Sequence, residues 1–171
     1  MVRTLALPVT LAAIALAVTP AAAVADPPAT TTYAIGKCVV SQDQPAQARP
    51  ARFDYNCDGT GVMDTMTWTS WNSDGAKGTG TDTSVECQPN CAQGAKLTNP
   101  IVVHAWNAMP ASDPACPQNV NFYSDMTIAY PKAAPPWIKP GTNWDVGTDF
   151  ATVDGMPAVH FSGLKPNCLS G

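Results

Sequence analysis

Two histidines, His104 and His160, are the imidazole bases that the chain offers for catalysis. A histidine can take a proton from a serine hydroxyl near neutral pH. The available serines are Ser41, Ser70, Ser73, Ser84, Ser112, Ser124, Ser162 and Ser170. None of them stands in the G-x-S-x-G pattern of a nucleophile elbow. A small hydrolase with a site around His104 or His160 is therefore one hypothesis, although His104, between Val102 and Trp106, also fits a packed position.

The six cysteines are a second group with chemical potential. They are Cys38, Cys57, Cys87, Cys91, Cys116 and Cys168. An even number of cysteines in an exported chain predicts disulfides, here three. A structural zinc site would need two close pairs of cysteine or histidine ligands, and only Cys87 and Cys91 are close. A bridge between Cys38 and Cys168 would join the two ends of the domain, and we take it as a working guess.

The segment from Asp54 to Gly59 resembles the first half of a calcium-binding loop, with oxygen ligands at alternate positions before a glycine. The twelfth position is Thr65, where such a loop needs a bidentate glutamate. Asp58-Gly59 is also a frequent hairpin turn, and we favour that interpretation. The single glutamate, Glu86, defines no carboxylate pair for glycoside hydrolysis. We predict no metal site and no cofactor.

Tryptophans are better candidates for binding than for catalysis. Trp71, Trp137 and Trp144 fall at strand ends or in loops rich in glycine and proline, where a large ring can be partly exposed. Trp71 follows Trp68 by three residues, so a regular strand would point the two rings to opposite faces. We assign Trp68 and Trp106 to the core. The alternative for all three candidates is that they too cover the core.

The elements that must position these residues are strands. Alternation of apolar and polar residues predicts strands near 53–57 and 65–69, joined as a hairpin. Further strands are expected over 101–106, 120–130 and 158–164. The small residues over 76–81 predict a strand that passes close to a backbone or over a bulky ring. No stretch of the sequence combines helix-capping residues with apolar residues at helical spacing. We therefore predict an all-β fold, an antiparallel sandwich or barrel stapled by disulfides.

The N-terminus has the order of a secretory signal. A basic start is followed by an apolar run from Leu5 to Val18, and Ala23-Val24-Ala25 offers a small-x-small cleavage site. We therefore expect a signal peptide over 1–25, a flexible leader rich in Pro, Ala and Gln over 26–52, and one β domain over 53–171. No membrane segment is expected after cleavage.

Three motifs follow one another in the middle of the chain: Trp68-Thr69-Ser70-Trp71, then Gly78-Thr79-Gly80, then Cys87-Gln88-Pro89-Asn90-Cys91-Ala92-Gln93-Gly94. This series resembles a family of small secreted actinobacterial proteins of the mycobacterial type. The match extends roughly from Phe53 to Tyr130. This resemblance implies an exported location and no particular activity, and it assigns no catalytic residue.

Composition narrows the function classes. The chain has 9 basic and 13 acidic residues and a formal net charge of −4. Its lysines are scattered, so nucleic acid is not an expected partner. We expect a non-catalytic binding module, secreted or associated with the cell envelope, that recognises a protein or glycan surface. A small exported hydrolase and a structural envelope component are the alternatives.

Overall fold

The computed structural model describes residues 30–87 and 89–169, and within these ranges every regular element is a β-strand. The strands are β1 (Thr32–Ile35), β2 (Val39–Val40), β3 (Phe53–Asp54), β4 (Gly61–Asn72), β5 (Gly75–Val85), β6 (Lys96–Pro110), β7 (Val120–Ala129), β8 (Asn143–Asp145), β9 (Thr148–Val153), β10 (Met156–Phe161) and β11 (Asn167–Cys168). The predicted all-β class is confirmed. The predicted signal peptide, 1–25, lies outside the described residues.

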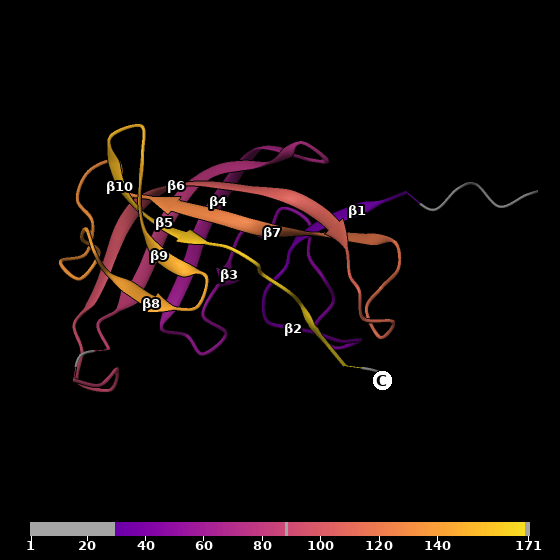
Figure 1. Cartoon of the computed structure of the whole chain (residues 1–171), viewed down its shortest axis with the longest axis horizontal. Coiled ribbons are helices and arrows are strands. Elements are labelled where there is room, and N and C mark those ends of the chain that lie inside the picture. Colours follow the sequence, from indigo (N-terminus) through magenta and orange to yellow (C-terminus); the bar gives the residue numbers. More distant parts are fainter. Residues whose placement is uncertain (1–29, 88, 170–171) are drawn as a thin grey trace, which may run out of the picture.

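Most strands belong to one curled sheet that forms a half-barrel (Figure 1). Its order is β3-β4-β5-β6-β7-β10-β9-β8, with antiparallel neighbours throughout, and β1 pairs with β7 in parallel. A second, two-stranded sheet joins β2 to β11, also in parallel. The long strand predicted over 101–106 is central, since β6 pairs with β5 on one side and β7 on the other.

The hairpin of β4 and β5 shows why glycines recur in the second strand. A Cβ at Gly78 would lie 2.6 Å from Cε3 of Trp68, so only glycine lets the backbone pass over the indole. This confirms the predicted strand over a bulky ring. Hydrophobic residues from β4 to β10, including Met63, Val103 and Phe161, then fill the main core.

An irregularity in β4 changes the faces of two tryptophans. Thr65 has a φ of 51°, and the pairing with β5 shifts register between Asp64 and Thr67 and again between Trp68 and Ser70. The ring centroids of Trp68 and Trp71 consequently lie 4.6 Å apart. The prediction that these rings point to opposite faces is therefore wrong, because bulges break the two-residue alternation on which it depended.

The leader expected over 26–52 contributes to the fold. Within it, β1 pairs with Val120 to Tyr123 of β7, and Ala34 and Ile35 are buried. The core therefore begins about twenty residues before the predicted boundary at residue 53. The sequence pattern did not predict this short strand, because its neighbours are polar and rich in proline. Its partner strand also lies far away in the sequence.

All six cysteines form disulfides, as predicted. The pairs are Cys38–Cys57, Cys87–Cys91 and Cys116–Cys168. The guessed Cys38–Cys168 bridge is wrong. The two ends of the domain nevertheless lie together, because β2 pairs with β11 and the amide of Asn167 donates to the carbonyl of Cys38.

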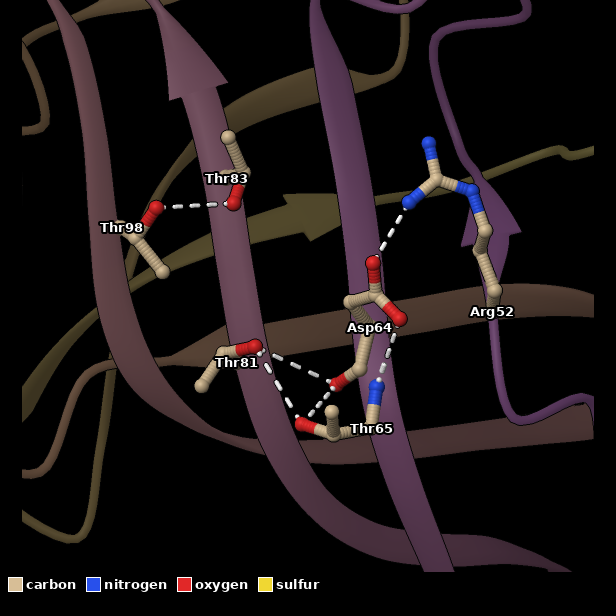
Figure 2. A network of polar contacts seen from close by, with 6 residues as sticks. All are labelled: Arg52, Asp64, Thr65, Thr81, Thr83 and Thr98. Carbon is tan, nitrogen blue, oxygen red and sulfur yellow. Dashed lines mark hydrogen bonds and ion pairs between the residues drawn. The ribbon is translucent and has the colours of Figure 1, made fainter.

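A polar network covers the outer face where β4, β5 and β6 meet (Figure 2). Arg52 forms an ion pair with Asp64, whose backbone carbonyl accepts from Thr65 and Thr81. Farther along the same strands, the hydroxyls of Thr83 and Thr98 lie 2.9 Å apart. These side chains therefore satisfy much of one another's hydrogen-bonding capacity.

Candidate functional site

The main candidate site is a cleft with a volume of about 330 Å³. Its lining comes from the turn after β3, the end of β5, several residues within 137–148, β10 and Lys37. The lining residues are Lys37, Tyr55, Asn56, Asp58, Thr60, Ser84, Val85, Glu86, Cys87, Trp137, Ile138, Trp144, Asp145, Thr148, Val159 and Phe161. Two of the three predicted binding tryptophans thus meet in one cleft.

Trp137 and Trp144 are held there by different elements. Trp137 lies in the proline-rich segment between β7 and β8, where the amide of Ile138 donates to the carbonyl of Pro135. Its ring is partly buried against the main core. Trp144 belongs to β8, the last strand of the sheet, and is 37% exposed. An edge strand leaves this indole accessible to a ligand.

Trp71, the third predicted binding tryptophan, is a core residue. It is 8% exposed, and its indole N–H donates to the carbonyl of Tyr33 at 2.8 Å. Its ring also makes an edge contact with Tyr123. The prediction that Trp71 offers a binding surface is therefore wrong, because the bulges in β4 turn it inward.

Lys37 enters the cleft from the segment between β1 and β2. The Cys38–Cys57 disulfide ties this segment to the turn that carries Asp58. The ammonium lies 4.8 Å from the centroid of the Phe161 ring. Burial lowers the pKa of Lys37, while Asp145 and Asp58 act in the opposite direction. Lys37 is not among the predicted site residues, because it lies in the segment expected to be a leader.

The calcium-like segment forms a tight turn. The carboxylate of Asp54 accepts hydrogen bonds from the amides of Asn56, Cys57 and Gly59. Gly59 has a φ of 79°. Hydrogen bonds from Thr60 to the exposed carboxylate of Asp58 lower its pKa, so Asp58 is a stable negative charge at the rim of the cleft.

A buried carboxylate is hydrogen-bonded to one of the residues that line the cleft. Asp82 is 0% exposed, and the hydroxyls of Tyr55 and Tyr130 each donate to it at 2.8 Å. Burial raises the pKa of Asp82, and the hydrogen bonds from the two tyrosines oppose that shift. Since Tyr55 also lines the cleft, this network holds one wall in place.

Alkaline conditions are expected to unfold the protein through its buried tyrosines. Burial raises the pKa of Tyr123 to about 12. Burial, with the charge of Asp82, also raises the pKa of Tyr55 and Tyr130. Because these folded-state values exceed the unfolded value near 10, stability is complete below about pH 10 and falls as the pH rises towards the folded-state values.

The expected loss is about 1.4 kcal/mol per pH unit for each tyrosine that stays protonated in the folded state. Tyrosinate absorbance and near-ultraviolet circular dichroism should be followed together during a base titration. We expect most of the absorbance to rise in a cooperative step with the loss of tertiary structure. A gradual rise in a protein that stays folded would contradict the assignment.

The two histidines lie outside the cleft. Both stack on Trp106, with centroid distances of 4.9 Å for His104 and 5.7 Å for His160. Trp106 is partly exposed and does not belong to the main core, contrary to expectation. Its contact with both imidazoles could not be found from periodicity, because His160 comes from a distant strand.

His160 has a carboxylate neighbour at each ring nitrogen. Its Nδ1 lies 3.4 Å from a carboxylate oxygen of Asp149, and its Nε2 lies 3.8 Å from one of Asp125. Ser124 donates its hydroxyl to Asp125. Among the described residues, no serine hydroxyl forms a hydrogen bond with either imidazole. Within residues 30–87 and 89–169, the hydroxyl of Ser124 is therefore directed to a carboxylate and not to an imidazole.

Two other hollows are less suited to binding. They have volumes of about 290 and 350 Å³ and lie around residues 34–54 and beside Cys116. Neither is lined by a tryptophan. The cleft with Trp137 and Trp144 combines aromatic and polar groups, which is the usual composition of a ligand site.

Fold and site together define an all-β, disulfide-stapled protein with an aromatic cleft, lined by residues of β8 and of the turn after β3, the two end strands of the curled sheet. Across the residues described, there is no helix of the length and apolarity needed to cross a membrane. No protein-family model, curated protein or solved structure matches the chain.

Proposed function

We propose that this chain is an exported, non-catalytic binding protein whose cleft holds a glycan. The observation that carries the proposal is the meeting of Trp137 and Trp144 with polar side chains in one cleft. The apolar face of a sugar ring can stack on an indole, and the hydroxyls at its edge can bind carboxylates and amides. A cleft of about 330 Å³ has room for roughly one or two sugar rings.

Export is supported by three separate features. The N-terminus has the order of a secretory signal, and the motif series resembles small exported actinobacterial proteins. All six cysteines are paired, which is typical of oxidising compartments. The glycan would thus belong to the cell envelope or to its surroundings.

Trp144→Ala is expected to weaken glycan binding about tenfold, because it removes the exposed stacking surface of the cleft. The oxidised protein should be titrated with envelope oligosaccharides, with binding followed by calorimetry and by tryptophan fluorescence. Trp106→Ala is the matched control, since Trp106 lies outside the cleft and should leave the affinity unchanged.

Three outcomes would contradict the proposal. A flat response to every glycan would favour a structural envelope component. Equal losses in the two tryptophan variants would mean that the ligand does not bind in the cleft. Release of shortened sugars during the titration would support the hydrolase, and His104→Ala and His160→Ala would then identify its base.

A further inference from the structure

The cleft is lined by more acidic than basic side chains. Asp58, Glu86 and Asp145 line it with carboxylates, whereas Lys37 is the one basic side chain among the described lining residues. Carboxylates next to aromatic faces favour a cation, because both attract positive charge. The cleft is therefore poorly suited to an acidic sugar.

Lys37 already places one amino group in the cleft, although burial lowers its pKa. Its ammonium lies over the Phe161 ring and is attracted by Asp145 and Asp58. The carboxylates still exceed this single positive charge. A second cation could therefore be accommodated nearer the rim, where Trp144 is exposed.

A buried hydroxyl in the cleft also lacks a partner. Ser84 is 6% exposed, lines the cleft, and its Oγ forms no hydrogen bond with any described residue. The hydroxyl is close enough to Asp82 to favour the charged carboxylate, yet the contact lacks hydrogen-bond geometry. Buried polar groups are normally satisfied, so a group of the ligand is a reasonable partner for this one.

We propose that the ligand is an amino sugar with a free amine, as in oligomers of glucosamine. The ammonium would lie among Asp58, Glu86 and Asp145, and a sugar ring would stack on Trp144. This inference rests on the proposed glycan-binding function. It adds that the positive charge of the sugar amine selects this ligand among glycans.

The test compares two oligosaccharides of equal length, one of glucosamine and one of N-acetylglucosamine. They differ in the amine, which is charged only in the first. At about pH 5.5, where ordinary carboxylates are ionised, we expect the glucosamine oligomer to bind about tenfold more tightly. Added salt should reduce that advantage, because the charged rim is exposed to screening.

Two variants are expected to change the affinity for the glucosamine oligomer in opposite directions. Asp145→Asn removes one carboxylate at nearly constant shape and should weaken the glucosamine oligomer about threefold to fivefold. Lys37→Met removes the resident cation and should strengthen the same oligomer by a similar factor. Neither should change binding of the acetylated oligomer by more than about twofold. Asp113→Asn, outside the cleft, is the matched control.

The outcomes separate this inference from the function on which it rests. Equal affinity for the two oligomers would overturn the amino-sugar assignment and leave glycan binding intact. A loss of affinity in Lys37→Met would overturn it as well, since that result indicates an anionic ligand. No binding of either oligomer would overturn the assignment, and glycan binding itself would fail only if other envelope glycans were also inactive. Binding of oligolysine but of no glycan would overturn both.

Discussion

Asp82→Ala is expected to lower the free energy of unfolding by about 3 kcal/mol, because it leaves two buried hydroxyls without an acceptor. Tyr55 and Tyr130 each donate to this carboxylate, which is fully buried. Each orphaned hydroxyl costs about 1 to 3 kcal/mol. Burial disfavours the ionised form of Asp82, so removing this carboxylate offsets part of the lost stability.

Denaturant unfolding of the oxidised protein measures this effect. Asp74→Ala, in the exposed turn after β4, is the matched control and should change stability by less than about 0.5 kcal/mol. A triple variant, Asp82→Ala with Tyr55→Phe and Tyr130→Phe, should recover part of the loss, because no hydroxyl is then orphaned. If the triple variant were no more stable than Asp82→Ala, the hydrogen-bond explanation would be wrong.

Removal of the Cys116–Cys168 bridge should cost about 4 kcal/mol, and removal of Cys87–Cys91 about 2 kcal/mol. The reason is the length of chain that each bridge closes, with sequence separations of 52 and 4 residues. A longer closed loop removes more conformational freedom from the unfolded chain. Cys116 and Cys168 are also buried in the second core cluster, whereas Cys87 and Cys91 are exposed.

Each bridge should be removed by a pair of alanines and the variants compared by denaturant unfolding. Both variants should keep the strand signature in far-ultraviolet circular dichroism. Equal losses, or a greater loss for the Cys87–Cys91 pair, would contradict the loop-length argument. The Cys87–Cys91 variant has a second use, because Cys87 lines the cleft and its removal tests whether that rim supports ligand binding.

Strands with strong local signals were predicted well. The apolar residues of 101–106 lie within β6, and those of 120–129 lie within β7. The predicted hairpin of 53–57 with 65–69 is correct only in part, because β3 pairs with residues 62–63 of β4, and residues 67–68 pair with β5. The even number of cysteines predicted three disulfides, and three form. The strands β8 and β9, which carry Trp144 and Asp149, were not predicted. Both are short, and neither has a continuous apolar face to indicate it.

Only some residues of the candidate site could be predicted from the sequence. Trp137 and Trp144 were chosen because their surroundings favour exposure, and the structure brings both to the cleft. Trp71 was chosen for the same reason and is buried, because the bulges in β4 change which face its ring occupies. Lys37 and Phe161 were not chosen, since neither has a local pattern that marks it as a site residue.

The sequence by itself determined the all-β class and the presence of paired cysteines, because alternation, turn residues and composition act over a few neighbouring positions. Only the tertiary structure decided which cysteines pair, which face Trp71 occupies and which residues meet in the cleft. These outcomes depend on the curl of the sheet and on contacts between distant segments. Lys37, Asp58, Trp144 and Phe161 come from four such segments, and the folded half-barrel brings them to one place.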